Sequence, residues 1–201
     1  MTDNNNSLND EIKNKLEKQQ KQKDQKLILV IMGVSGSGKT TIGKAIASSL
    51  GCGFNDADEF HSEENKEKMR SGIPLNDDDR KPWLASINKR MIEFLNDESV
   101  ADCCSDHVFT CSALKSIYRD QLSNGINKDN ILFIFLQGTK QLLSERLQSR
   151  KDHFFNPTLL DSQLSTLELP TQLELSNHHY AFIDISNSID DIIDEIFNYL
   201  K

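Results

Sequence analysis

The stretch GVSGSGKT, Gly33 to Thr40, most constrains how this chain can fold. It fits the pattern G-x-x-x-x-G-K-[ST] at every fixed position, follows the apolar run LILVIM and opens a stretch of helical character. Its glycines allow successive backbone N–H groups to turn inward, and the following helix adds the positive end of its dipole. The stretch therefore predicts a strand, a loop and a helix that together hold a nucleoside triphosphate.

Two side chains of this loop have predicted roles of their own. Lys39 is expected to reach the β- and γ-phosphates, and the Thr40 hydroxyl is expected to ligate Mg²⁺. The loop alone does not choose between GTPases, ATPases and kinases of nucleotides or small metabolites. A regulatory GTPase is disfavoured, because the chain has no D-x-x-G sequence and its nearest match to N-K-x-D, NKDN, misplaces the aspartate. The predicted nucleotide contacts in the loop are Gly33, Val34, Ser35, Gly36, Ser37, Gly38, Lys39 and Thr40.

Strand-like and helix-like stretches alternate along the chain. Strands are predicted at Leu27–Met32, near Phe54, and at His107–Cys111, Ile131–Leu136 and Tyr180–Ile185. Helices are predicted at Lys39–Leu50, Pro82–Asn96, Ser112–Ser123, Lys140–Arg150 and Ile189–Leu200. This alternation predicts an α/β fold, a three-layer, doubly wound, five-stranded parallel sheet.

Length and composition limit the domain organisation and the partners. A chain of 201 residues has room for one compact domain, expected over residues 27–201. Residues 1–26 are almost entirely polar and are expected to form a disordered tail, with a helix that docks on a partner as the alternative. A net charge of −8 gives no indication of nucleic-acid or membrane binding. Without a secretion signal, a long apolar run or paired cysteines, the expected location is cytoplasmic.

Two carboxylates follow the second predicted strand. Asp56 and Asp58 are two residues apart, so their side chains share a face of the sheet, at the strand end that lines the ligand crevice of open α/β folds. Transfer of a phosphoryl group to an alcohol needs a proton acceptor and a carboxylate near Mg²⁺. We predict that Asp56 serves the metal with Thr40 and that Asp58 accepts the proton. A solvated acidic turn is the alternative.

A basic residue follows three adjacent carboxylates further along. In NDDDRKPW, the aspartates at 77–79 precede Arg80. They are either exposed charges at the start of a helix or groups that fix the pose of Arg80, because three adjacent carboxylates cannot all be buried unpaired. A guanidinium can clamp a carboxylate with two hydrogen bonds, so Arg80 is a candidate for holding an anionic substrate.

Taken together, the motifs resemble the gluconokinases of the P-loop type. The block N-x-x-K-M-x-x-G-x-P-L-N-D-D-D-R-x-P-W-L at Asn65–Leu84 and the CSALK segment that begins at Cys111 are specific to this family, whereas the loop alone is not. The resemblance spans residues 27 to about 186, roughly four-fifths of the chain. The other matching stretches are GVSGSGKT, DADEFH, the Y-R-D that ends at Asp120, and R-x-x-x-R-K-x-H-F-F at Arg146–Phe155.

The resemblance implies transfer of the γ-phosphoryl group of ATP, with Mg²⁺, to the 6-hydroxyl of D-gluconate. Lys39, Asp58 and Arg150 would be the catalytic residues. A helix-surface position is the alternative for Lys68, and Ser112 could bind water instead of substrate. Cys111 is expected to be a packing residue rather than a nucleophile. The expected substrate contacts are Asp58, His61, Lys68, Arg80, Ser112 and Arg119.

A basic lid is the remaining part of the implied site. Arg146 and Arg150 are four residues apart and share a helical face, and the lid is expected to cover about residues 146–170. Both arginines would bind the nucleotide when the lid closes over the phosphates, although an exposed, salt-bridged helix is the alternative. Gln163 and Glu168 match the family segment Q-x-x-T-L-E, for which a contact to substrate or lid is expected.

Other functions remain open at this point. A related kinase could act on another small sugar acid, a polyol or a nucleotide, and a regulatory nucleotide-binding protein would have no acceptor substrate at all. Gluconate-dependent release of ADP would separate these alternatives. Similar proteins are often dimers, so a homodimer is a further expectation.

Overall fold

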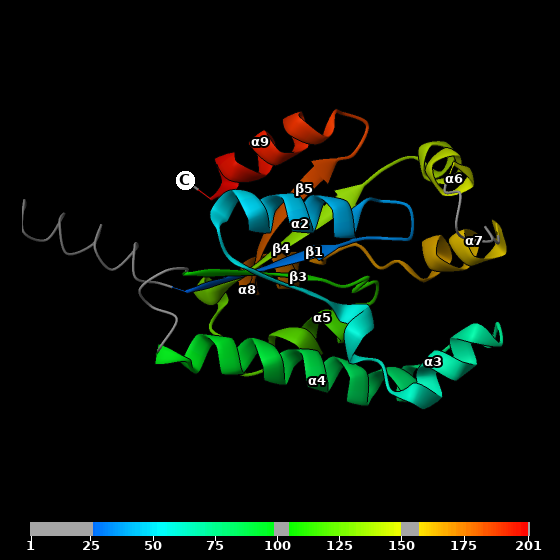
Figure 1. Ribbon diagram of the computed structural model, residues 1–201, viewed down its shortest axis with the longest axis horizontal. Helices are drawn as coiled ribbons and strands as arrows, with labels where there is room; N and C mark the ends of the chain where they lie inside the picture. The colour runs from blue at the N-terminus through cyan, green and yellow to red at the C-terminus, as the bar shows by residue number, and fades with distance from the viewer. Residues whose placement is uncertain (1–25, 99–104, 150–156, 201) are drawn as a thin grey trace, which may run out of the picture.

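The computed structural model describes residues 26–98, 105–149 and 157–200. They form a five-stranded sheet in which all neighbouring strands run parallel, in the order β2-β3-β1-β4-β5 (Figure 1). The expected parallel sheet is therefore confirmed. The strands are β1 (Leu27–Met32), β2 (Gly53–Asp56), β3 (Asp106–Thr110), β4 (Ile131–Gln137) and β5 (His179–Asp184).

Helices cover both faces of the sheet and also extend beyond one of its ends. Figure 1 shows α2 and α9 on one face, α4 and α5 on the other, and α3, α6 and α7 toward the carboxyl ends of the strands. This is the three-layer arrangement that the alternating pattern predicts. The helices are α2 (Lys39–Leu50), α3 (Glu63–Arg70), α4 (Asp77–Asn96), α5 (Ser116–Ser123), α6 (Lys140–Gln148), α7 (Pro157–Thr166), α8 (Gln172–Asn177) and α9 (Ile189–Tyr199), with short 3₁₀ helices η1 (Ala57–Phe60) and η3 (Lys128–Asn130).

The central strand β1 explains why the run LILVIM is apolar at every position. Ile28 and Val30 belong to the core cluster on the α4 side of the sheet, and Leu29 and Ile31 belong to the cluster on the α2 side. Successive side chains of a strand point to opposite faces, so a strand covered on both faces has no exposed position. The helical residues in the clusters include Trp83, Leu84, Ile87 and Met91 of α4, and Ile42, Ile46, Ile192 and Ile196 of α2 and α9.

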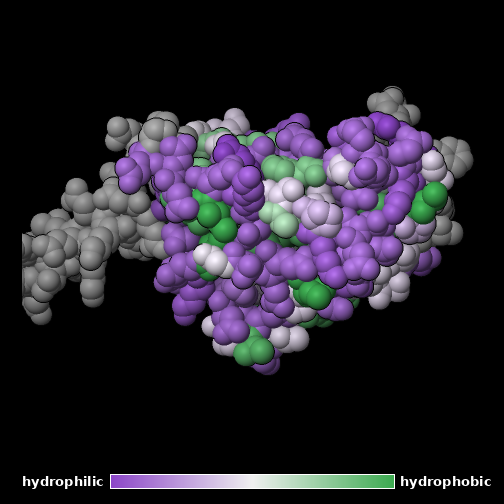
Figure 2. Space-filling model, turned by 90° about the horizontal axis from the view of Figure 1, so that it is seen from below, coloured by the Kyte–Doolittle hydropathy of each residue, from purple (hydrophilic) through white to green (hydrophobic). Residues whose placement is uncertain are grey.

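Helix α4 begins five residues earlier than the expected start at Pro82. Asn76 and Asp79 form a capping box, in which each side chain accepts a hydrogen bond from the other residue's backbone N–H. The cap therefore fixes the start at Asp77, although Pro82 cannot donate a helical hydrogen bond. The surface seen from the α4 side is mostly hydrophilic with scattered apolar patches (Figure 2), as expected for a helix that buries one face.

Helix α5 begins at Ser116, four residues after the expected start at Ser112. The intervening backbone turns into a loop in which Ala113 has a φ of 45°, a left-handed conformation that a helix cannot contain. Ser112 and the rest of the CSALK segment therefore lie in a loop at the carboxyl end of β3, next to the phosphate-binding loop. The predicted helix over Ser112–Ser123 is wrong in its first turn.

The described chain begins at a lysine that is tied to the end of α4. The Nζ of Lys26 donates to the carbonyl oxygen of Phe94 at 3.0 Å and also to that of Asp97. The Phe94 carbonyl also accepts the Asp97 N–H at 3.3 Å, so the cation adds a second donor at the end of the helix where positive charge is favourable. Residues 1–25 of the expected disordered tail lie outside the described residues, whereas its last residue, Lys26, is held by these contacts. Among the described residues no helix is long and apolar enough to cross a membrane.

The buried His107 of β3 is expected to make the stability of the fold depend on pH. Its ring is 7 % exposed, lies 2.9 Å from Asn55 Oδ1 and packs against Phe94 and Phe109. Burial, with a smaller contribution from Arg90, lowers the His107 pKa from 6.5 to about 4. Between these pH values the unfolded chain binds a proton that the folded chain excludes, so the free energy of unfolding falls as the pH falls. We expect this position to account for a loss on the order of 3 kcal/mol.

Urea unfolding at several pH values between 7.5 and 4 tests this expectation. The variant His107→Gln keeps an amide group that can bond to Asn55 but removes the titration, so its stability should depend less on pH over this window. Other titrating groups act equally on both proteins and cancel in the comparison. Parallel stability curves for the variant and the unchanged protein would show that His107 contributes nothing to the acid sensitivity.

Candidate active site

The phosphate-binding loop connects the central strand β1 to α2. Gly33, Gly36 and Gly38 all have positive φ, at 143°, 84° and 93°. A Cβ on Gly36 would also lie 2.9 Å from Leu147 Cγ and 3.0 Å from the Leu143 carbonyl oxygen of α6. No larger residue fits this position without displacing α6. The loop is therefore shaped by glycine both for its conformation and for the close approach of the neighbouring helix.

Two oxygen-bearing side chains meet where the start of α2 lies beside the end of β2. The Thr40 hydroxyl donates to Asp56 Oδ2 at 2.9 Å. A hydroxyl and a carboxylate are ligands that Mg²⁺ accepts, and this ion is usually held by one or two protein groups together with phosphates and waters. Within the described residues no cluster of three or more histidines, cysteines or acids could hold a metal by itself. The pair thus fits a magnesium ion that is shared with a nucleotide.

Asp58 lies in η1, directly after β2, and its orientation depends on Asp56. The Asp56 side chain caps η1 by accepting the Asp58 N–H at 3.2 Å. Part of the Asp58 side chain is open to solvent, but the surrounding chain restricts its hydration and raises its pKa above 3.8. The charge of Asp56 also raises this pKa, whereas His61 and Lys39 lower it. A carboxylate of raised pKa is a better proton acceptor.

His61 lies beside Asp58 and stacks on the first aromatic residue of α4. Its ring centroid is 4.4 Å from that of Trp83, with 10° between the planes, and Trp83 Nε1 donates to the Ala57 carbonyl at 2.7 Å. The side chain of His61 is 8 % exposed, and burial lowers its pKa below 6.5. Within the described chain its buried Nδ1 has no hydrogen-bond partner. A neutral imidazole nitrogen is therefore positioned for a polar contact next to Asp58.

Arg80 lies on the same side of the site. Its charge contributes to the lowered pKa of His61, so the two side chains are within electrostatic reach of each other. Its Nη1 donates to the Leu75 carbonyl, and its guanidinium carbon lies 5.7 Å from the centroid of the Tyr118 ring. These contacts hold the cation on the wall that also carries His61. His61 thus lies within electrostatic reach of both Asp58 and Arg80, and the contact of these three residues with a substrate stays a prediction.

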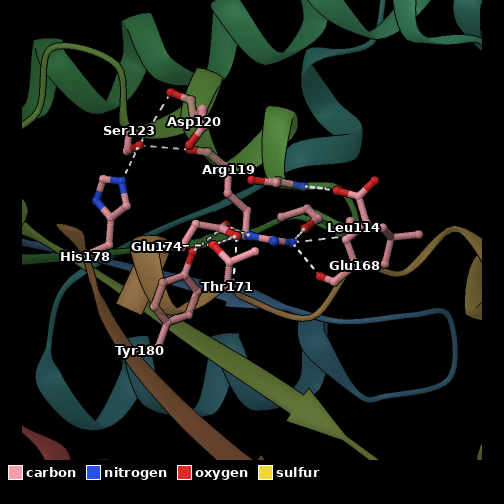
Figure 3. A network of polar contacts seen from close by, with 11 residues as sticks. Leu114, Arg119, Asp120, Ser123, Glu168, Thr171, Glu174, His178 and Tyr180 are labelled. Atoms are coloured by element: carbon pink, nitrogen blue, oxygen red, sulfur yellow. Dashed lines mark hydrogen bonds and ion pairs between the residues drawn. The ribbon is translucent and has the colours of Figure 1, made fainter. Parts of the chain in front are cut away.

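Arg119 does not belong to this group, although it was expected to contact the substrate. Its side chain is 0 % exposed, and Nε donates to Glu174 Oε1 at 2.8 Å (Figure 3). Its Nη1 donates to the carbonyl oxygens of Ala113, Leu114 and Glu168. This burial contradicts the expected substrate contact. The guanidinium instead holds the loop after β3 against α8 and the segment that precedes α8.

The pKa of Glu174, the acidic partner of this ion pair, is strongly lowered. Burial by itself would raise the pKa of Glu174, but the hydrogen bonds from Arg119 and from the Thr171 N–H hold it at about 2. Glu174 also completes a capping box with Thr171 at the start of α8. The network therefore joins α5, α8 and the loop after β3 through one buried charge pair.

Lys68 was also expected to contact the substrate, but its ammonium group is paired within the protein. Its Nζ lies 2.6 Å from Asp79 Oδ1, which connects α3 to the first turn of α4. Asp77, at the start of the same helix, pairs with Lys115 at 2.9 Å and accepts a hydrogen bond from the Tyr118 hydroxyl. The aspartates at 77 and 79 thus lock neighbouring segments together. Sequence reasoning missed these pairs because their partners lie in other elements.

The loop after β3 places Ser112 next to the phosphate-binding loop. The Ser112 carbonyl oxygen accepts a hydrogen bond from the Gly33 N–H at 3.3 Å, so the two loops are joined. The adjacent Cys111 is buried, and burial raises the pKa of its thiol to about 12. A thiol of this pKa remains protonated at neutral pH, which agrees with the predicted packing role of Cys111.

The lid region contributes one arginine within the described chain. Arg146 of α6 donates from Nη2 to the Ile185 carbonyl at 2.7 Å, and its Nη1 would lie 3.8 Å from a Cβ placed on Gly38. The side chain therefore runs alongside the phosphate-binding loop. Arg150, which was expected to be catalytic, lies outside the described residues.

The fold and the loop define a P-loop nucleotide-binding protein, and comparison with known families places it among the P-loop kinases. A family model described as shikimate kinase matches residues 35–201. A solved shikimate kinase from Aquifex aeolicus shares the fold, with a TM-score of 0.51 and 15 % identity over 87 % of this chain and 96 % of that one. Within this class, sequence similarity places the protein in a narrower family.

The chain belongs to the gluconokinase family. It is 85 % identical over 197 residues to a probable gluconokinase from Dictyostelium discoideum, covering 98 % of each chain. It is 38 % identical to the thermoresistant gluconokinase of Escherichia coli K12, over 87 % of this chain and 93 % of that one. A solved gluconokinase from Sinorhizobium meliloti gives a TM-score of 0.73 at 39 % identity, covering 87 % and 91 % of the two chains.

Proposed function

We propose that this protein transfers the γ-phosphoryl group of ATP to the 6-hydroxyl of D-gluconate and releases 6-phosphogluconate and ADP. The observation that carries the proposal is the placement of Asp58 next to Lys39 and the Thr40–Asp56 pair, where the end of β2 meets the phosphate-binding loop. Within one site these residues combine a phosphate cradle, a metal position and a proton acceptor. The membership of the chain in the gluconokinase family supports gluconate as the acceptor.

The nucleotide occupies the loop between β1 and α2. Backbone N–H groups of the loop and the positive end of the α2 dipole hold the phosphates. Lys39, at the first position of α2, reaches the transferring group and neutralises charge that develops on it. Arg146 adds a positive charge from α6 and Arg150 is proposed to do the same. Once the nucleotide is bound, these donors are already directed at the phosphates, so little further reorganisation is needed during the transfer itself.

The metal position is the pair formed by Thr40 and Asp56. The hydroxyl would ligate Mg²⁺ directly, and Asp56 would hold the ion through its water shell. When it is bound, Mg²⁺ screens the negative charge of the β- and γ-phosphates. The same carboxylate orients η1 through the Asp58 N–H, so the position of the base depends on the residue that serves the metal.

The acceptor side consists of Asp58, His61 and Arg80. Gluconate binds with its carboxylate toward the Arg80 guanidinium, while His61 contacts a hydroxyl group. The oxygen of the gluconate 6-hydroxyl forms a bond to the γ-phosphorus while Asp58 accepts the proton of this hydroxyl. At the same time, the bond from the γ-phosphorus to the bridging oxygen of ADP breaks. The proton stays on Asp58 until solvent removes it. One bond to phosphorus forms as one breaks, and the charge is conserved.

A panel of possible acceptors tests the assignment. ADP release should be accelerated by D-gluconate and much less by epimers of gluconate, shikimate or AMP, each measured at the same concentration with ATP and Mg²⁺. Faster release with AMP or shikimate than with gluconate would reassign the acceptor. An equally slow release with every compound would show a nucleotide-binding protein without an acceptor.

Replacement of Arg80 separates binding of gluconate from binding of ATP. In Arg80→Ala the Michaelis constant for gluconate should rise roughly 10- to 100-fold, because a charge-assisted hydrogen bond to a charged group contributes about 1.5–3 kcal/mol. The constant for ATP should stay nearly unchanged. Arg90→Ala is the matched control, since Arg90 lies on the same helix and pairs with the exposed Glu93 at 3.8 Å. An unchanged gluconate constant in Arg80→Ala would remove Arg80 from the acceptor site.

A further inference from the structure

The phosphate-binding loop already has an oxygen atom bound to one of its backbone donors. The Ser35 N–H donates to Oε1 of Gln163 at 2.6 Å, a contact that joins residues 128 positions apart. Ser35 is the third residue of the loop, where inward-facing N–H groups are arranged to hold phosphate oxygens. The amide oxygen of Gln163 therefore occupies one of the backbone donors of the phosphate-binding loop.

Gln163 is held at this position by the packing of its helix. Leu160, one turn earlier on α7, is 1 % exposed and belongs to the core cluster on the α2 side. Asp161 pairs with Lys140 of α6 at 2.6 Å. After α7, Glu168 accepts the Ser116 N–H at 2.7 Å. Three neighbouring parts of the molecule thus hold the segment that carries Gln163, so only the Gln163 side chain has to turn for the Ser35 N–H to be released.

We propose that Gln163 competes with the nucleotide for the Ser35 N–H. The inference rests on the proposed function only in that the loop binds a nucleoside triphosphate. In the nucleotide-free protein the Gln163 amide satisfies this donor. When nucleotide binds, a phosphate oxygen takes the N–H and the Gln163 side chain moves away, so the contact lowers nucleotide affinity and ties the arrival of the phosphates to the position of α7.

The chemistry of the two acceptors favours exchange over sharing. A phosphate oxygen carries charge and forms a stronger hydrogen bond with a backbone N–H than a neutral amide oxygen does. A single N–H that is already bound at 2.6 Å has no second hydrogen to offer. Each nucleotide that binds in this way has to break the existing bond, and the net contribution of that bond is subtracted from its affinity.

Nucleotide affinity in two variants of Gln163 tests the proposal. Gln163→Ala removes the competing oxygen, so ADP and a non-hydrolysable ATP analogue should bind roughly 2- to 10-fold more tightly, as measured by calorimetry without gluconate. Gln163→Glu keeps the acceptor and adds a negative charge, so both nucleotides should bind more weakly than they do to the unchanged protein. The control is Gln141→Ala on α6, whose side chain pairs only with Glu145 among the described residues.

A gain in affinity cannot come from a damaged fold, so the direction of the change is decisive. Unchanged or weaker binding of ADP by Gln163→Ala would overturn the proposal. Adenosine, which lacks phosphates, should bind both proteins equally, and tighter binding of adenosine by Gln163→Ala would also overturn it. If nucleotide binding follows these expectations but gluconate does not accelerate ADP release, only the acceptor assigned under the proposed function fails.

Discussion

Replacement of Asp58 by asparagine is expected to lower kcat by roughly 10²- to 10⁴-fold, the usual contribution of a positioned general base. Asparagine keeps the size and the polarity of the side chain but cannot accept the proton of the 6-hydroxyl. Nucleotide affinity should change little, because the phosphate cradle consists of loop amides and Lys39. Steady-state kinetics together with direct measurement of ADP binding separates the two effects.

The neighbouring Glu59 provides the control for Asp58. Glu59 lies in the same short helix and is exposed, so Glu59→Gln removes a similar charge without touching the site and should keep normal turnover. The pH profile gives an independent check. Because Asp58 must be ionised to act, kcat/KM should rise with pH through the pKa of this carboxyl, which burial and Asp56 hold above 3.8. Normal turnover in Asp58→Asn would assign the base to another residue.

Replacement of Arg119 by leucine is expected to lower the free energy of unfolding by about 3–5 kcal/mol, the usual cost of removing one member of a buried ion pair. The variant leaves Glu174 buried without its cation and leaves three carbonyl groups without the donor that binds them. Urea unfolding measures the loss. Soluble protein of unchanged stability would contradict the structural role assigned to Arg119.

A double variant shows how much of the cost belongs to the unpaired charge. In Arg119→Leu/Glu174→Leu neither charge remains, so the loss of stability should be smaller than the sum of the two single losses. The carbonyl groups of Ala113, Leu114 and Glu168 still lack a donor, and recovery is therefore expected to be partial. Strict additivity would mean that the two side chains do not interact energetically.

The parts of this molecule that the sequence predicts well depend on local patterns. GVSGSGKT, the apolar run before it and the helix after it are contiguous, so one motif defines β1, the loop and α2. Asp56 ends β2, as the sequence predicts, but Asp58 lies in η1, so the expected shared face of the sheet is wrong. The two residues are linked instead by the hydrogen bond from the Asp58 N–H to Asp56 Oδ1. The start of α4 is also encoded locally, because Asn76 and Asp79 have the spacing of a capping box, whereas the start expected at Pro82 omits this cap.

The misplaced residues depend on contacts between distant segments. Nothing near Arg119 in the sequence distinguishes a buried guanidinium from one at a strand end that faces a ligand. Its partner Glu174 is 55 residues away, and α8, which carries Glu174, was not expected as an element. The contact between Gln163 and Ser35 likewise requires α7 to be packed beside the loop. Such pairs are determined by tertiary packing, which overrides local signals.

The protonated thiol at the end of β3 has a practical consequence for chemical labelling. With a pKa of about 12, Cys111 is ionised at neutral pH to only about 10⁻⁵, and its side chain is buried. Maleimides, iodoacetamide and peroxide react with thiolates, so they should spare this sulfur while the domain stays folded. Inactivation by such a reagent would then report either modification elsewhere in the chain or a transient opening of the sheet.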